Sequence, residues 1–216
     1  MELSKMKAEA VVWDWNGTLL NDLMVSIRAM NLMLQKRGYD LLEPGRYRSI
    51  FTFPVREYYR MAGVDFDEHD WDAVAMEFID NYRAGVREAV LHDGASDVIS
   101  YLKNKGYRQF ILSAMQQHFL EETVGERLNI DFFEKVMGLN DHYAATKAGN
   151  ARMLVDELKI DADRLVMIGD TLHDFEVARD AGMRCILVAN GHQSRERLET
   201  SGMMVVDRLT ELMELF

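Results

Sequence analysis

The chain has 216 residues, 48% of them hydrophobic, and a formal net charge of -11, which fits one large domain or a core domain with a small insertion. Such an acidic chain repels nucleic acid and anionic membranes, and its single cysteine, Cys185, excludes an internal disulfide and a thiolate metal cluster. No stretch reaches the roughly 18 apolar residues of a membrane span and no signal peptide is visible, so we expect a cytoplasmic protein.

The first predicted strand is a short apolar run, Ala8 to Asp14, which ends at an acidic residue as a buried parallel strand does. A helix follows and ends at Gly38, and either Asn21 or Asp22 can cap its beginning. Two further helices are predicted at 54–62 and at about 70–90. The segment 21–90 therefore contains helices and no convincing strand.

From residue 95 onward, predicted helices and strands alternate. The strands are expected at 107–113, 135–138, 165–170, 184–189 and 203–206, and the helices at 95–105, 116–127, 148–158, 174–181 and 209–216. Alternation of this kind is typical of an α/β fold with a doubly wound parallel sheet. The simplest organisation is an α/β core, residues 1–20 and 91–216, interrupted once by a helical cap, residues 21–90.

Reactive side chains gather at predicted strand ends, where ligands bind in a sheet of this type. Four segments carry them: Asp14-Trp15-Asn16-Gly17-Thr18, Ser113 with Ala114, Lys147, and Gly169-Asp170 through His173-Asp174. Each segment alone has a structural explanation as a turn, a helix cap, a solvated lysine or a charge at a helix start. Their order, with a helical insertion after the first, favours one joint site.

With these residues, the whole chain resembles the haloacid dehalogenase superfamily. Its insertion resembles the C1-type cap of phosphoglycolate phosphatases and β-phosphoglucomutases, and the ending from Ala181 to Gly191 is typical of that branch. The resemblance implies a Mg²⁺-dependent phosphatase for a small phosphorylated metabolite such as phosphoglycolate. It also implies a monomer or homodimer with no nucleic-acid or membrane partner.

The resemblance assigns the nucleophile and the metal ligands. Asp14 would attack phosphorus and form an aspartyl-phosphate. Asp14, Asp170 and the backbone carbonyl of Asn16 would hold Mg²⁺. Asp174 would bind a metal-bound water or orient Lys147.

The resemblance also assigns the phosphate-binding groups. Thr18, Ser113 and the backbone N–H of Ala114 would bind phosphoryl oxygens, and Lys147 would neutralise their charge. Relatives follow this lysine with proline, whereas Ala148 stands here. Substrate specificity in this branch lies in the cap, whose candidate residues are Arg46, Arg48, Arg56, Tyr58 and Tyr59.

Asn16 departs from the phosphatase pattern, in which an aspartate two places after the nucleophile protonates the leaving group and deprotonates water. An amide cannot carry a proton near neutral pH, and losing this help costs about a hundred- to ten-thousand-fold in rate. Three interpretations stay open: another group or a good leaving group covers the step, the chain is a weak or inactive relative that binds a phosphorylated ligand, or the asparagine is engineered. His142 is a candidate replacement for the proton carrier. A phosphonate hydrolase and a sugar-phosphate mutase are weaker alternatives.

Overall fold

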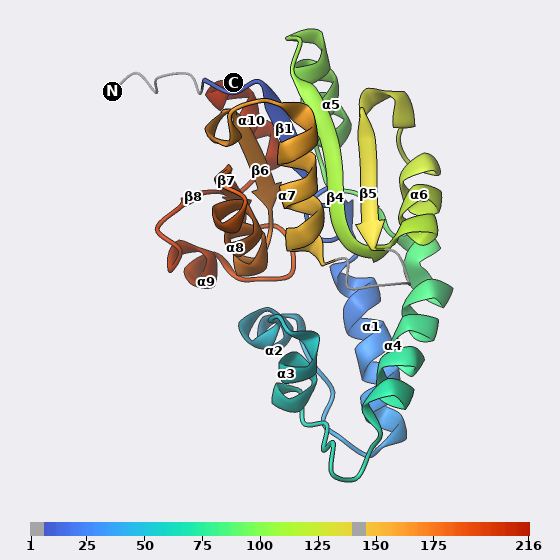
Figure 1. The fold of residues 1–216 in the computed structure, drawn as a ribbon. Helices are drawn as coiled ribbons and strands as arrows, with labels where there is room; N and C mark the ends of the chain where they lie inside the picture. The colour runs from blue at the N-terminus through green and yellow to red at the C-terminus, as the bar shows by residue number, and fades with distance from the viewer. Residues whose placement is uncertain (1–6, 140–145) are drawn as a thin grey trace.

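The computed structural model describes residues 7–139 and 146–216. Its centre is a six-stranded sheet with the order β5-β4-β1-β6-β7-β8, and every pairing in this sheet is parallel. Figure 1 shows this sheet with helices on both faces and a separate group of helices beyond the carboxyl end of β5. The strands are β1 (Ala10–Trp13), β4 (Arg108–Gln116), β5 (Lys135–Leu139), β6 (Leu165–Gly169), β7 (Arg184–Val188) and β8 (Met204–Val206).

Strand β1 is buried on both faces because its side chains alternate between two hydrophobic clusters. Val11 and Trp13 pack into the cluster that also contains side chains of α5 (Ala95–Asn104), α6 (Gln117–Gly125) and α10 (Leu212–Leu215). Ala10 and Val12 pack into the cluster on the other face, formed with α7 (Lys147–Leu158) and α8 (Leu172–Asp180). This double burial explains why the strand is apolar throughout its length.

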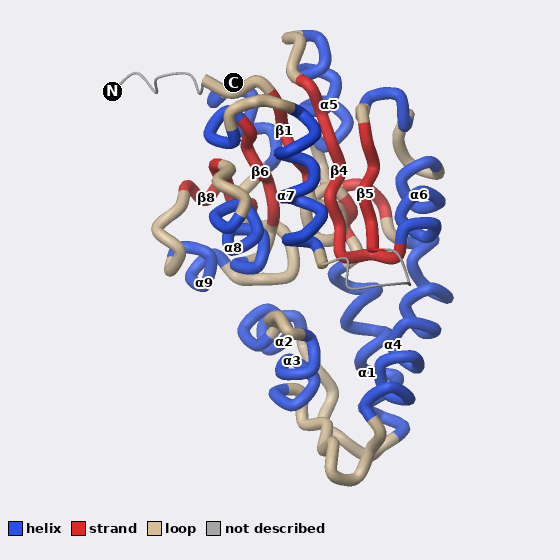
Figure 2. The backbone as a smooth tube through the Cα atoms, in the orientation of Figure 1, coloured by secondary structure: helices blue, strands red, loops and turns tan. Residues whose placement is uncertain are grey.

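The four α-helices between β2 (Leu20–Asn21) and β3 (Val90–Leu91) form a group with a hydrophobic cluster of their own, and Figure 2 shows them as a helical region apart from the central sheet. They are α1 (Leu23–Lys36), α2 (Pro44–Ile50), α3 (Val55–Met61) and α4 (Trp71–Gly85). A small antiparallel sheet of β2 and β3 joins the two ends of this region. The separate cluster and this joint support our proposed division into a core and a cap at about residues 21 and 90.

The predicted α/β fold and the alternation of its elements are confirmed. Two short helices, α2 and α9 (Arg195–Glu199), were not predicted. The segment 21–90 was expected to contain no strand, but the two-residue strands β2 and β3 lie at its ends. The short 3₁₀ helices are η1 (Val86–Glu88), η2 (Ile130–Phe132), η3 (Ala162–Arg164) and η4 (Leu209–Glu211). Within the described ranges, no helix combines the length and the apolar character that a membrane crossing needs.

Candidate active site

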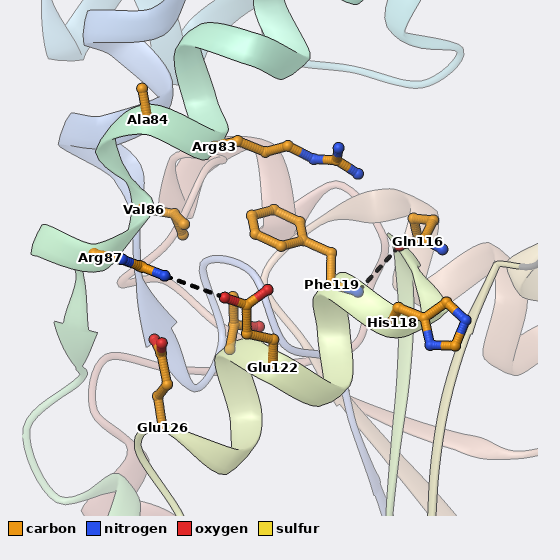
Figure 3. A pocket seen from close by; sticks show the side chains of 10 residues that line it. Arg83, Ala84, Val86, Arg87, Gln116, His118, Phe119, Glu122 and Glu126 are labelled. Carbon is orange, nitrogen blue, oxygen red and sulfur yellow. Dashed lines mark hydrogen bonds and ion pairs between the residues drawn. The ribbon is translucent and has the colours of Figure 1, made fainter.

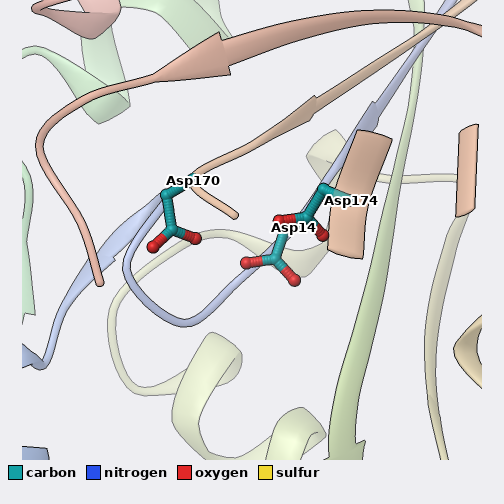
Figure 4. Close-up of side chains that lie close together, drawn as sticks. All are labelled: Asp14, Asp170 and Asp174. Atoms are coloured by element: carbon teal, nitrogen blue, oxygen red, sulfur yellow. The ribbon is translucent and has the colours of Figure 1, made fainter. Parts of the chain in front are cut away.

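Three aspartates meet at the carboxyl ends of β1 and β6 (Figure 4). The parallel register pairs Trp13 with Ile168, so Asp14 and Asp170 emerge from neighbouring strands at the same edge. Asp174 comes from the first turn of α8. One carboxylate oxygen from each of the three lies within 4.8 Å of the others, and all three side chains are buried.

Lys147, the first residue of α7, extends into this cluster. Its ammonium group contacts Asp14 Oδ1 and lies 2.6 Å from Asp174 Oδ1. Asp174 is held in turn by Thr171, whose backbone N–H and hydroxyl donate to Asp174 Oδ2 at 3.0 and 2.7 Å. Lys147 was expected in the loop after β5, but it is the first residue of α7. Its ammonium group lies between Asp14, which follows β1, and Asp174 of α8.

The acids differ in the direction of their pKa shifts. Burial, reinforced by the neighbouring Asp174 and Asp170, raises the pKa of Asp14 to about 8 even though Lys147 opposes it. Burial likewise raises the pKa of Asp170 to about 6. Burial alone would raise the pKa of Asp174 as well, but the Lys147 ammonium group lowers it below its ordinary value. Asp174 is thus the acid that Lys147 keeps ionised.

The donor set fits a divalent cation. Three buried carboxylates lie close together, and the ammonium group of Lys147 contacts two of them. Burial, with repulsion from neighbouring carboxylates, raises the pKa of Asp14 and Asp170, and a bound cation would oppose both effects. Carboxylate oxygens are the ligands that Mg²⁺ prefers. The buried aspartate triad is therefore consistent with a metal site.

Of the predicted phosphate-binding residues, Thr18 contacts two of the aspartates directly. The Thr18 hydroxyl is buried 3.0 Å from Asp170 Oδ1 and 3.2 Å from Asp14 Oδ2. Ser113, near the end of β4, is buried and its hydroxyl oxygen accepts from the backbone N–H of Met115 at 3.0 Å. Ala114 follows it and is exposed. The structure brings Thr18 and Ser113 to the edge of the sheet that carries the aspartates.

Asn16 takes part in a buried polar network. Its amide nitrogen lies 2.8 Å from Asp22 Oδ2 and 2.7 Å from the Tyr82 hydroxyl. Asp22 also accepts from the Gly17 backbone N–H at 2.9 Å and pairs with His192 Nε2 at 3.1 Å. Of the two predicted caps of α1, Asn21 and Asp22, the structure places Asp22 at the N-cap position. Its side chain makes no capping hydrogen bond, because its carboxylate oxygens are occupied by Asn16, Gly17, His192 and the Tyr82 hydroxyl, which donates at 2.6 Å.

The loop after β7 supplies residues that the sequence patterns did not reveal. The backbone N–H of His192 donates to Asp170 Oδ2 at 2.6 Å. Next to it, Gly191 has no room for a side chain, because a Cβ there would overlap the Asp170 carboxylate and Gly17 O. In the sequence, the only signal for this loop was Gly191, as the last residue of the segment from Ala181 to Gly191 that resembles the phosphoglycolate phosphatase branch. The contact of His192 with Asp170 exists only in the folded chain.

Of the cap arginines proposed for substrate recognition, Arg46 and Arg56 are engaged within the cap, whereas Arg48 reaches the loop after β7. Arg48 donates to Gly191 O at 3.0 Å, Arg46 donates to Met61 O at 3.2 Å, and Arg56 lies over the Phe66 ring. The candidate tyrosines, Tyr58 and Tyr59, are buried in the hydrophobic cluster of the cap. His142 lies outside the described residues.

The Phe53 ring of the cap stacks on His173 in the fourth motif, with ring centroids 4.4 Å apart. The cap thus reaches the residue that directly precedes Asp174. By contrast, an open pocket of about 460 Å³ lies away from the aspartates, between the end of α4 and α6 (Figure 3). There Arg87 and Glu122 form a salt bridge of 3.5 Å, and none of the aspartates lines the pocket.

Comparisons with known proteins agree with this geometry. The haloacid dehalogenase-like hydrolase family matches residues 11–188. The chain is 26% identical to N-acetylmuramic acid 6-phosphate phosphatase of Pseudomonas aeruginosa over 221 residues, covering 99% of this chain and 96% of that protein. It is 27% identical to a phosphoglycolate phosphatase of Caulobacter vibrioides over 206 residues, covering 93% and 86%.

The fold is also found among solved structures. A haloacid dehalogenase-like family protein from Streptococcus pneumoniae has a TM-score of 0.82 at 18% identity, covering 95% of this chain and 97% of that chain. The family match spans more than half of the sequence and includes β4, β6 and all of β1 except its first residue. The chain therefore belongs to the haloacid dehalogenase-like hydrolases.

Proposed function

We propose that this chain is a phosphatase that hydrolyses a small phosphorylated metabolite through an aspartyl-phosphate on Asp14. The observation that carries the proposal is the position of Asp14, which follows β1 directly and meets Lys147, Asp170 and Asp174 at one buried point. A carboxylate nucleophile splits phosphate transfer into two easier steps, formation and hydrolysis of a covalent intermediate.

The residues around Asp14 have distinct tasks in this proposal. Asp14 attacks phosphorus, and the bond between phosphorus and the leaving oxygen breaks. Lys147 balances the negative charge that spreads over the phosphoryl oxygens, while Ser113, the Ala114 N–H and Thr18 bind those oxygens.

Mg²⁺ is the cofactor we propose for this site. Asp14, Asp170 and the Asn16 carbonyl would hold it, with Asp174 next to them. When bound, it would screen the repulsion between the nucleophile and the phosphate. Asp174 would also hold Lys147 in place, as their 2.6 Å ion pair suggests.

Two substrates merit direct comparison. Phosphoglycolate is the first candidate from the sequence resemblance and from the Caulobacter relative. N-Acetylmuramic acid 6-phosphate is the second, because the relative that acts on it aligns over 99% of this chain. The aspartates are buried beneath the cap contacts, so we propose that the cap moves to admit either substrate.

The test is phosphate release from both compounds, and from acetyl phosphate and p-nitrophenyl phosphate, with and without Mg²⁺. We expect activity with Mg²⁺ and a loss of about a thousand-fold or more in Asp14→Asn. Cap-surface variant Arg28→Ala, whose partner Glu88 is exposed, is the control and should retain activity. Equal activity in Asp14→Asn would refute the nucleophile assignment, and inactivity toward every compound would favour a ligand-binding relative.

A further inference from the structure

The side-chain amide of Asn16 has a defined direction. Its nitrogen forms a closed triangle with Asp22 Oδ2, at 2.8 Å, and the Tyr82 hydroxyl, at 2.7 Å. The third side of the triangle is the hydrogen bond from Tyr82 to Asp22, at 2.6 Å. At the other end of the amide, Oδ1 lies 3.4 Å from the Ser113 hydroxyl, on the side of the proposed phosphate site.

The hydrogen bonds around Asp22 determine this direction. Its carboxylate accepts from the Gly17 backbone N–H at 2.9 Å and from the Tyr82 hydroxyl at 2.6 Å, and it pairs with His192 Nε2 at 3.1 Å. A carboxylate surrounded by these donors acts as a hydrogen-bond acceptor. The amide therefore turns its nitrogen to Asp22 and its oxygen to Ser113, since the reverse orientation would place two acceptors in contact.

We propose that Asp22 and Tyr82 are positioning residues that turn the Asn16 amide so that its Oδ1 orients the water that hydrolyses the aspartyl-phosphate. This inference rests on the proposed phosphatase function. The water oxygen bonds to phosphorus, the bond from phosphorus to Asp14 breaks, and its electron pair returns to the carboxylate. Both water hydrogens leave with the released dihydrogen phosphate, so Asn16 accepts a hydrogen bond and takes no proton.

The same orientation of the Asn16 amide should slow formation of the phosphoenzyme for some substrates. Because the amide nitrogen faces Asp22 and Tyr82, Asn16 offers no donor to the leaving oxygen. A carboxylate or nitrophenolate departs without a proton, whereas an alkoxide needs one. Acyl and aryl phosphates should therefore form the phosphoenzyme faster than alkyl phosphates, and the second step is best measured with them.

The test is a double-mutant cycle with Tyr82→Phe, Asn16→Ala and the double variant. Rapid quench with acetyl phosphate and Mg²⁺ measures how fast the phosphoenzyme forms and how fast it decays. Tyr82→Phe should slow the decay about three- to ten-fold and leave formation unchanged, as expected for one lost hydrogen bond. In the Asn16→Ala background, Tyr82→Phe should have no further effect, because Tyr82 acts through Asn16.

Tyr107→Phe is the matched control. The Tyr107 hydroxyl donates to Phe216 O at 3.3 Å, so this variant also loses one tyrosine hydrogen bond, but in the core and away from the aspartates. Its removal should leave formation and decay unchanged. If Asn16→Ala fails to fold by circular dichroism, Asn16→Ser takes its place in the cycle.

Two results would overturn the positioning role: the same fold-loss for Tyr82→Phe in both Asn16 backgrounds, or slower formation in place of slower decay. Either result would leave the proposed function intact if the phosphoenzyme still depends on Asp14. If the unaltered chain forms no phosphoenzyme and releases no phosphate, the proposed function fails together with this inference.

Discussion

At Asn16, an amide stands 2.8 Å from a carboxylate that is ionised and buried. An aspartate here would place two acids in contact, and one of them would keep a proton because like charges so close cannot both ionise. A retained proton is what a departing alkoxide needs. The identity of residue 16 therefore decides which leaving groups the site serves.

This leads to a prediction for Asn16→Asp. Its kcat for phosphoglycolate should rise about a hundred-fold, within the usual range of general acid catalysis, and the gain should shrink as pH rises and the shared proton is lost. Acetyl phosphate, measured in parallel, should gain little because its leaving group needs no proton. Equal gains for both substrates at every pH would contradict this explanation.

Gly191 provides a second prediction for a single residue. A Cβ at this position would overlap the carboxylate of Asp170, the proposed Mg²⁺ ligand, so Gly191→Ala should displace that carboxylate and lower both Mg²⁺ affinity and phosphate release at least about ten-fold. Gly45→Ala is the control, since a Cβ there meets no atom within 4 Å. Calorimetric titration with Mg²⁺ measures the difference, and unchanged affinity in Gly191→Ala would count against Asp170 as a ligand.

The sequence allowed some site residues to be predicted and concealed others for a physical reason. Asp14, Asp170 and Ser113 follow apolar strands, and parallel strands bring their carboxyl ends to one edge. Asp22, Tyr82 and His192 have no such local signal. Asp22 is 60 residues from Tyr82 and 170 from His192. The first contact exists only once α1 and α4 have packed together, and the second only once the cap has packed on the core.

Among the elements, the loop that follows β7 and helix α9 connect the core to the cap. Arg197 of α9 donates to Phe51 O at 2.6 Å, and Gln193 donates to the same carbonyl at 2.8 Å. Gln193 also accepts from the backbone N–H of Leu172, at the start of α8. Gln193 therefore connects the backbone carbonyl of Phe51, in the cap, to α8, the helix that carries Asp174.

We expect Arg197→Ala to loosen this end of the cap by about 1–3 kcal/mol, the usual cost of removing a charged hydrogen-bond donor. Amide hydrogen exchange in α2 should become faster, while exchange in β1 should not change. Arg195→Ala, from the same helix, is the control because its partners Glu199 and Asp207 lie outside the cap. Equal exchange rates in α2 for the two variants would rule out this contact as a cap restraint.

The elements that escaped prediction are short or polar. Helix α2 has seven residues and begins with Pro44-Gly45, and α9 has five residues of which four are charged, so neither shows a helical apolar period. Strands β2 and β3 have two residues each. Long periodic helices such as α1 and α4, by contrast, were predicted because their buried faces repeat over several turns.

At the scale of the whole molecule, the buried acids should make stability depend on pH and on metal. The folded-state pKa values of Asp14 and Asp170, about 8 and about 6, exceed the ordinary value of 3.8. The unfolded chain therefore releases these protons at lower pH than the folded chain, and the free energy of unfolding falls as pH rises from about 4 to about 8. His192 acts in the same direction, since Asp22 raises its pKa to about 9 against the effect of burial.

Without metal, we expect Tm to fall by at least about 3 °C between about pH 5 and about pH 8, the shift that about 1 kcal/mol gives in a chain of this size. Mg²⁺ should raise Tm more at the higher pH, because protons compete with the cation for the carboxylates. Scanning calorimetry checks both effects, and Asp170→Asn should reduce the response to Mg²⁺. An identical Mg²⁺ response at both pH values would argue against the carboxylates as its ligands.

The paired strands β2 and β3 mean that the chain leaves and re-enters the α/β core at one place. Because both ends of the insertion lie side by side, the cap of a relative could be joined here without altering the strands of the central sheet. Such a graft would nevertheless remove Tyr82, which lies in the cap and touches Asn16. A chimera could therefore acquire a new substrate preference and lose reaction rate in the same exchange, unless the incoming cap brings a hydroxyl to that position.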